Sequence, residues 1–223
     1  MCQHAQMTIR DIARVLGAAG VLPWTLVGAP SLTASAHADQ CPDTEVVFAR
    51  GTGEPPGVGG VGQAFVDSLE SQLAGRSLQV YAVNYPATAD YVNSALAGAS
   101  DAGAHIQNIV AECPKTSVVL GGYSQGAGVM DLVSNQMPAQ LANHVAAVAL
   151  FGNPSSSYAK SLTDGRIPAV NAVYRPKTID LCLPDDIICA DGGNMVPHLL
   201  YVQNGMPDQA AAFVASRLQQ PSA

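Results

Sequence analysis

A pentapeptide of the form Gly-x-Ser-x-Gly spans residues 122–126. It follows the apolar, β-branched run 117–121, which predicts a strand, and precedes a segment predicted to be helical to about Asn135. This context is typical of a nucleophile elbow, in which a strained turn lifts Ser124 clear of the sheet and the glycines avoid collisions with neighbouring backbone. The first amides of the helix then point toward the reacting carbonyl, so the backbone N–H of Gln125 is expected to form half of an oxyanion hole. A serine that merely caps a helix is the alternative interpretation, and the strand-to-helix position argues against it.

A serine nucleophile needs a base, and α/β-hydrolases supply the acid and then the base later in the chain. After residue 38 the histidines are His105, His144 and His198. The first two lie in segments predicted to be helical, where a surface or capping histidine is the ordinary interpretation. His198 follows a loop after the last predicted strand, a position from which a hydrolase histidine reaches back over the nucleophile. We therefore predict that His198 is the base.

The orienting acid is expected between the nucleophile and the base, shortly after a strand. The aspartates that satisfy this order are Asp164, Asp180, Asp185, Asp186 and Asp191. Asp185 and Asp186 stand out because they lie between Cys182 and Cys189, where a disulfide would hold the loop and fix a carboxylate beside the imidazole. Spacing alone does not separate these two neighbours.

The elements that position these residues alternate along the chain. Strands are expected at residues 44–50, 78–83, 117–121, 145–151 and 172–179, and helices at 61–74, 91–112, from the elbow to about 135, and at 208–218. Strands that alternate with helices imply a mainly parallel sheet covered on both faces. The predicted fold class is therefore α/β, a three-layer sandwich of the α/β-hydrolase type.

A second glycine motif, G-x-G-x-x-G at residues 57–62, raises the possibility of a dinucleotide site. The acidic residue that would bind a ribose hydroxyl after the second strand is absent, since Asn84 and Tyr85 stand there. Pro55 and Pro56 also lengthen the turn beyond the tight one that the motif needs. We interpret the segment as a flexible loop near the active site, and no cofactor is expected.

The first 38 residues have the layout of a secretory signal peptide. Arg10 and Arg14 precede an apolar stretch over residues 15–29, and the A-x-A tripeptide 36–38 follows. A membrane anchor is the alternative, but Pro23 interrupts a stretch already too short to cross a bilayer comfortably. We expect residues 1–38 to be removed and residues 39–223 to form one secreted domain, with retention at the cell surface left open.

The composition excludes several classes of function. The chain of 223 residues is 48% hydrophobic and 12% charged, which suits one domain with a substantial core. Its net charge is −7 and its ten Lys and Arg residues are scattered singly, so nucleic acid and anionic membranes would be repelled. We expect neither a nucleic-acid partner nor stable membrane insertion.

Four cysteines remain after the predicted signal peptide: Cys41, Cys113, Cys182 and Cys189. An even number in an exported protein favours two disulfides, and three pairings are possible. A zinc site is the competing interpretation. The absence of C-x-x-C and of suitably spaced histidines argues against it, and no metal is expected.

The motifs at residues 121–127 (GGYSQGA), 182–189 (CLPDDIIC) and 197–198 together resemble the cutinase family, especially its actinobacterial cutinase-like members. The likeness continues through residues 49–52, 150–152 and 165–168 and so covers nearly all of the predicted mature chain.

The resemblance implies Ser124 as nucleophile, Asp186 as acid through the C-x-x-x-D-x-x-C spacing, and His198 as base. It implies that Thr52 completes the oxyanion hole with Gln125. It also implies a lidless fold and disulfides between the pairs Cys41–Cys113 and Cys182–Cys189. Separately, we expect a monomer.

The function expected from these observations is that of a secreted serine esterase that hydrolyses short or medium acyl esters or polyesters through an acyl-enzyme. An acyl groove is expected to be lined by the apolar residues Met195, Val196, Leu199 and Leu200. The alternative is that these side chains simply pack in the core. A lipase or phospholipase that acts on lipid is the alternative, and a secreted binding protein with a vestigial triad is a more distant one.

Overall fold

A computed structural model describes residues 41–219 of the protein. The expected signal peptide at residues 1–38 and the start of the mature chain at residue 39 lie outside the described residues. The chain forms a five-stranded sheet in the order β2-β1-β3-β4-β5. Every strand pair is parallel, which confirms the predicted parallel sheet. The strands are β1 (Thr44–Ala49), β2 (Leu78–Ala82), β3 (Ser117–Tyr123), β4 (Val145–Phe151) and β5 (Thr178–Leu181).

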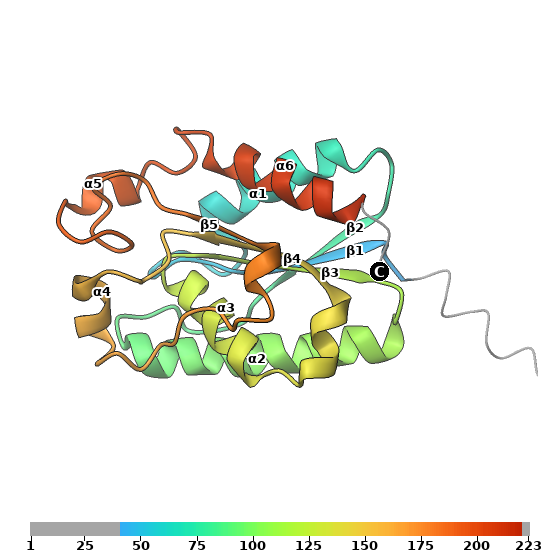
Figure 1. Cartoon of the computed structure of the whole chain (residues 1–223), viewed down its shortest axis with the longest axis horizontal. Helices are drawn as coiled ribbons and strands as arrows, with labels where there is room; N and C mark the ends of the chain where they lie inside the picture. The colour runs from blue at the N-terminus through green and yellow to red at the C-terminus, as the bar shows by residue number, and fades with distance from the viewer. Residues whose placement is uncertain (1–40, 220–223) are drawn as a thin grey trace, which may run out of the picture. The chain divides into compact units, whose positions relative to one another are not determined.

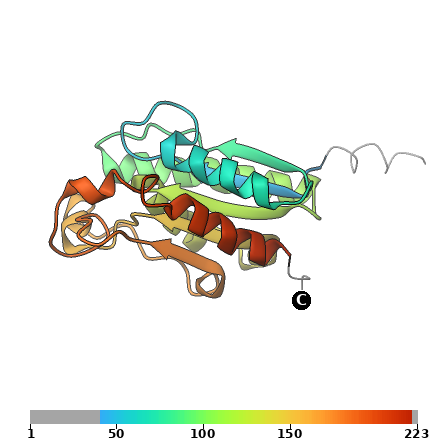
Figure 2. The same ribbon diagram turned by 90° about the horizontal axis from the view of Figure 1, so that it is seen from above.

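Helices cover both faces of this sheet (Figure 1). One face carries α1 (Gly59–Gln72) and α6 (Met206–Leu218), which run side by side (Figure 2). The other carries α2 (Tyr91–Glu112) and α3 (Gln125–Gln136). This arrangement confirms the predicted three-layer α/β sandwich. The shorter elements are α4 (Ser157–Leu162), α5 (Met195–His198), and the 3-10 helices η2 (Ala139–His144) and η3 (Arg175–Lys177).

The two faces of the sheet are packed with side chains of different size. Under α1 and α6, the rings of Phe48, Phe65 and Phe151 lie with centroids 5.9–6.3 Å apart. On the opposite face, α2 buries small residues, including Ala95 and Ala99. Small side chains let a helix backbone approach the sheet closely.

The expected strand at residues 172–179 was wrong in its first half. The structure has a turn and then η3 before β5, which begins only at Thr178. Pro176 lies in the first turn of η3 and has no N–H to donate to a neighbouring strand. The short helices α4 and α5 were not predicted, because each spans less than two turns and shows no periodicity.

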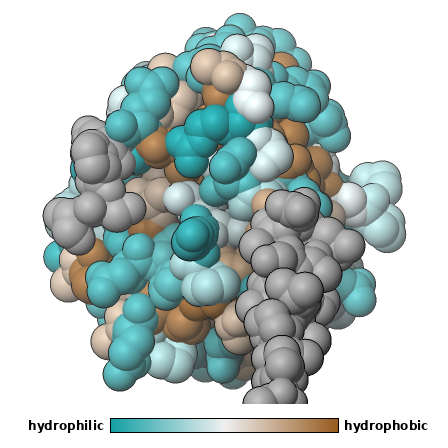
Figure 3. Space-filling model, turned by 90° about the vertical axis from the view of Figure 1, so that its right-hand side faces the viewer, coloured by the Kyte–Doolittle hydropathy of each residue, from teal (hydrophilic) through white to brown (hydrophobic). Residues whose placement is uncertain are grey.

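The carboxyl ends of the strands lie at the end of the sheet that carries α4 and α5 (Figure 1). Exposed apolar side chains gather around α5, including Met195, Val196 and Leu199. The opposite end, where the strands begin, presents mainly hydrophilic residues with small hydrophobic areas between them (Figure 3). Within residues 41–219, no helix is long and apolar enough to span a bilayer.

Asp131 is a buried carboxyl on α3, on the sheet face covered by α2 and α3. Within the described residues, one of its oxygens has no hydrogen-bond partner, and the same is true of the side-chain oxygen of Asn153. Burial raises the pKa of Asp131 to about 8; a hydrogen bond with Asn153 opposes the shift and the charge of Asp180 adds to it. Asp131 is therefore mainly neutral at pH 7.

We predict that this carboxyl makes the protein less stable as the pH rises. The folded state keeps the Asp131 proton up to pH 8, whereas an unperturbed aspartate loses it near 3.8. Between these values the group lowers the free energy of unfolding by up to about 1.4 kcal/mol per pH unit. Asp131→Asn removes this term, so urea unfolding at pH 5 and pH 8 should show the variant gaining stability over the wild type at pH 8. Equal differences at the two pH values would contradict the prediction.

Candidate active site

The turn from β3 into α3 holds Ser124 in a backbone conformation that is rare for a residue with a side chain, with φ 55° and ψ −120°. A Cβ on Gly122 would lie 2.2 Å from the carbonyl oxygen of Gly126. A Cβ on Gly126 would lie 1.9 Å from the carbonyl oxygen of Ala49. The backbone N–H of Ser124 donates to the Phe151 carbonyl at 2.8 Å. The turn therefore needs both glycines, and it is fastened to both neighbouring strands.

His198 joins the serine to an aspartate. Its Nε2 lies 2.8 Å from Ser124 Oγ, and its Nδ1 lies 2.8 Å from Asp186 Oδ2. Asp186 is fully buried and His198 is 3% exposed. The three side chains selected in the sequence are thus brought into one hydrogen-bonded row.

The loop between Cys182 and Cys189 shows which of the two neighbouring aspartates faces His198, a choice that spacing left open. Asp186 is buried, whereas Asp185 is exposed and has a positive φ of 63°. The disulfide Cys182–Cys189 closes this loop, and the N–H of Ile188 donates to Asp186 Oδ1 at 2.9 Å. The remaining candidate acids, all exposed, are Asp164, Asp180 and Asp191.

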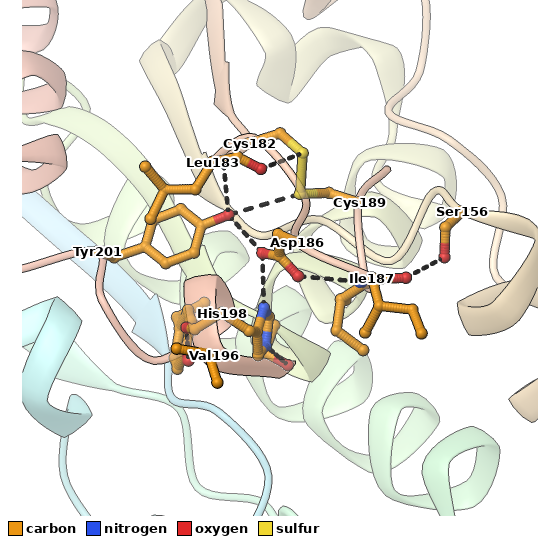
Figure 4. A network of polar contacts seen from close by, with 12 residues as sticks. Ser156, Cys182, Leu183, Asp186, Ile187, Cys189, Val196, His198 and Tyr201 are labelled. Atoms are coloured by element: carbon orange, nitrogen blue, oxygen red, sulfur yellow. Dashed lines mark hydrogen bonds and ion pairs between the residues drawn. A yellow bond between two sulfur atoms is a disulfide. The ribbon is translucent and has the colours of Figure 1, made fainter. Parts of the chain in front are cut away.

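Asp186 is held by several donors (Figure 4). Burial by itself raises the pKa of its carboxyl, but hydrogen bonds from His198, the Ile188 N–H and Tyr201 outweigh burial and hold the pKa below its ordinary value. The Asp186 carboxyl therefore stays ionised while it is completely shielded from water.

The segment before His198 folds back on the acid loop. Asn194 forms a parallel bridge with Asp186 and donates its N–H to the Asp185 carbonyl at 3.0 Å. Its side-chain oxygen accepts the N–H of Val196 at 2.8 Å and so caps α5. His198 is the last residue of α5 rather than part of a loop. Gly152 leaves room for the imidazole, since a Cβ there would lie 2.7 Å from His198 Cε1.

The other two histidines lie elsewhere, as expected. The Nε2 of His105 is 2.5 Å from Oε1 of the buried Glu45, and the ring of His105 stacks on Tyr81. His144 ends the short helix η2.

Thr52 and Gln125 line the same pocket as Ser124 and are the candidate oxyanion-hole residues. Gln125 is the first residue of α3, where a backbone N–H has no partner within its own helix. Its side chain is anchored at both ends, with Oε1 accepting from Ser94 at 3.0 Å and Nε2 donating to the Thr88 carbonyl at 2.9 Å.

Glu54 holds the loop that carries Thr52. Its carboxylate accepts the N–H of Gly51 at 2.6 Å and the N–H of Gly60 at 2.8 Å. A Cβ on Gly59 would lie 2.2 Å from this carboxylate. Residues 59–62 of the glycine-rich motif thus form the first turn of α1, so the expectation of a flexible loop was wrong for them, and the N–H of Gly60 binds a carboxylate of the protein itself.

A pocket of about 390 Å³ opens beside Ser124 and His198. Its lining is largely apolar and includes Ala159 and Leu162 from α4 and Met195 and Leu199 from in and just after α5. Val196 and Leu200, which were expected to line an acyl groove, are exposed and do not line this pocket.

Two residues at this site were missed in the sequence. Tyr201 donates its hydroxyl to Asp186 Oδ2 at 2.7 Å. Glu54 accepts backbone N–H groups from both ends of the loop that carries Thr52. Tyr201 follows His198 by only three residues, but this spacing gives no sign that a phenol reaches an acid on another loop. A lone acid in a segment rich in glycine and proline, such as Glu54, is a weak signal for a carboxylate that binds backbone N–H groups.

Comparisons with known proteins identify the family of the chain. The family model described as Cutinase matches residues 40–218. "Carboxylesterase Culp1" of Mycobacterium tuberculosis is 55% identical over 213 residues, which cover 95% of this chain and 98% of that protein. "Phospholipase Culp4" of the same organism is 48% identical, covering 91% of this chain and 90% of its own length.

A solved structure of Trichoderma reesei cutinase in complex with a C11Y4 phosphonate inhibitor is 34% identical to this chain, with a TM-score of 0.64. The match covers 81% of this chain and 78% of that one. The fold is therefore that of the α/β-hydrolases, and the chain belongs to the cutinase family of carboxylic ester hydrolases.

Proposed function

We propose that this protein is a secreted serine esterase in which Ser124, His198 and Asp186 hydrolyse carboxylic esters through an acyl-enzyme. The observation that carries the proposal is the position of His198, with one ring nitrogen 2.8 Å from Ser124 Oγ and the other 2.8 Å from the Asp186 carboxylate. This row of side chains borders an apolar pocket large enough for an acyl chain.

In the first half of the reaction, His198 Nε2 accepts the proton of Ser124 Oγ as the oxygen attacks the ester carbonyl. The imidazolium that forms donates its Nδ1–H to Asp186. The negative charge that develops on the carbonyl oxygen is stabilised by the backbone N–H groups of Thr52 and Gln125. His198 then returns the proton to the departing alcohol, and the acyl group remains on Ser124.

In the second half, water repeats the sequence on the acyl-enzyme. His198 takes a proton from water, and the new oxyanion occupies the same hole. Collapse of the tetrahedral intermediate releases the carboxylic acid and returns the proton to Ser124. No metal or cofactor takes part.

A lipase or phospholipase is the second candidate within the same chemistry. The apolar walls from α4 and α5 suit an acyl chain whether the ester is soluble or part of a lipid. The relative named a phospholipase is similar over nearly the whole chain. Hydrolysis of phosphatidylcholine vesicles, compared with soluble esters, distinguishes the two.

A secreted binding protein with a decayed triad is less well supported. A decayed site usually loses a member, whereas here each of the three side chains lies within hydrogen-bond distance of its neighbour. We also propose that residues 1–38 are cleaved on export and that residues 39–223 act as a single, monomeric domain.

The proposed nucleophile is tested by hydrolysis of p-nitrophenyl esters from acetate to palmitate. We expect turnover by the wild type and a loss of about 10⁴-fold or more in kcat for Ser124→Ala. A fluorophosphonate should label the wild type and not the variant. Full activity in Ser124→Ala, or no turnover and no labelling in the wild type, would falsify the serine mechanism.

We predict that the small disulfide loop serves activity more than stability. Replacing Cys182 and Cys189 together by serine releases the loop that carries Asp186, so kcat/KM should fall by about 10- to 100-fold. The control replaces Cys41 and Cys113, which are 72 residues apart and join the start of β1 to the end of α2. Because a longer closed loop restrains the unfolded chain more, the control should lose more in Tm and less in activity. The reverse ranking would refute this division of roles.

Glu54→Gln is expected to lower kcat by about tenfold with little change in KM. The amide can accept only one of the two backbone N–H groups, so the loop that carries Thr52 loosens and the oxyanion loses a fixed donor. Glu70→Gln, at an exposed position on α1, is the matched control and should behave as wild type. An increase in KM at constant kcat would argue instead for a role in substrate binding.

A further inference from the structure

Tyr201 is a fully buried phenol beside the proposed triad. Its ring lies edge-on to those of His198 and Phe151, with centroids 6.0 Å and 6.4 Å away, and 5.7 Å from the ring of Tyr123. These contacts fix the ring, so the position of its hydroxyl is set by packing rather than by solvent.

The hydroxyl of Tyr201 has one proton, and the groups around it determine which acceptor receives its hydrogen bond. The backbone N–H of Leu183 donates to the phenol oxygen at 3.3 Å and therefore uses it as an acceptor. The sulfur of Cys189, at 3.5 Å, is only a weak acceptor. Asp186 Oδ2, at 2.7 Å, is the strong acceptor within reach (Figure 4). Tyr201 therefore donates to the acid.

The carboxylate oxygen that accepts the Tyr201 hydrogen bond is the same one that lies beside His198. The Nδ1 of His198 lies 2.8 Å from Asp186 Oδ2, so the phenol and the imidazole share a single carboxylate oxygen. A donor to a carboxylate draws off part of its negative charge. The charge that remains to stabilise a protonated imidazole is then smaller than it would be without Tyr201.

We infer that Tyr201 is a positioning residue that acts through Asp186, and that its hydroxyl sets the pH at which the enzyme becomes active. This inference rests on the proposed function. With the hydroxyl present, the carboxylate is shared and His198 gives up its proton more readily. Without it, Asp186 keeps the Ile188 N–H but has one donor fewer, so more of its charge faces the imidazole and favours the protonated form, which is not a base.

Few other titratable groups face this pair within the described residues. From β3, Tyr123 stacks on the His198 ring with centroids 5.0 Å apart and donates its hydroxyl to the His198 carbonyl at 2.5 Å. Burial raises the pKa of Tyr123, and the charge of Glu54, which lines the same pocket, raises it further. Burial also raises the pKa of Tyr201, so both phenols are neutral across the working range. Cys182 and Cys189 form a disulfide and do not titrate.

The test is the pH dependence of kcat/KM on p-nitrophenyl butyrate for the wild type, Tyr201→Phe and Tyr123→Phe, from pH 4 to 9. The acid limb of this profile reports the protonation of the base in the free enzyme. In Tyr201→Phe we expect the limb to move to higher pH by about half a unit to one unit. The plateau should fall by about three- to tenfold.

Tyr123→Phe is the matched control. It also removes a buried hydroxyl next to His198, but that hydroxyl bonds to a backbone carbonyl and not to Asp186. Its acid limb should stay where the wild type has it, whatever happens to the plateau or to Tm. If Tyr201 only packs the core, Tyr201→Phe will lower Tm and leave the limb in place, which overturns the inference. A limb that moves to lower pH overturns it as well.

If Tyr201→Phe does not fold, 3-fluorotyrosine at position 201 keeps the ring and strengthens the donor. The acid limb should then move to lower pH, and an unchanged limb counts against the inference. All rates are measured above the background of Ser124→Ala. Failure of the proposed function would appear as activity in that variant, whereas failure of the Tyr201 inference would appear only in the position of the limb.

Discussion

The site depends on backbone packed directly against backbone at the turn between β3 and α3. There the chain at Gly126 passes so close to the Ala49 carbonyl that no side chain fits between them. The contact joins the helix that begins after Ser124 to the neighbouring strand β1, and the Ser124 N–H fastens the turn to β4 on the other side. Ser124 therefore has a fixed place because three strands of one sheet hold its main chain.

Asp186 and His198 are held by a different kind of structure. Asp186 lies in a short loop closed by Cys182 and Cys189, and His198 ends a helix of a single turn. Neither residue belongs to a strand. Their position comes from a dense set of hydrogen bonds, in which Asn194 ties the helix to the loop and three donors surround the Asp186 carboxylate. One half of the site is thus built by the sheet and the other half by local cross-links.

Much of this architecture could be predicted from the sequence because strand and helix patterns have a regular period. The parallel sheet and its covering helices follow from that period, and the elbow follows from its position between a strand and a helix. The choice between Asp185 and Asp186 could not follow from spacing, since it depends on which of two adjacent carboxyls the turn buries. The contribution of Tyr201 depends on a side chain reaching another loop, and the late start of β5 on a proline in η3.

The two short helices that contribute apolar lining to the pocket differ in what else they carry. The helix α5 also ends in His198, so a change there disturbs a residue of the proposed triad. The helix α4 contributes Ala159 and Leu162 and carries none of the proposed triad residues. Substitutions at Ala159 or Leu162 would therefore reshape the pocket without replacing a residue of the proposed triad. The fold thus offers a place where the substrate range of related esterases can diverge.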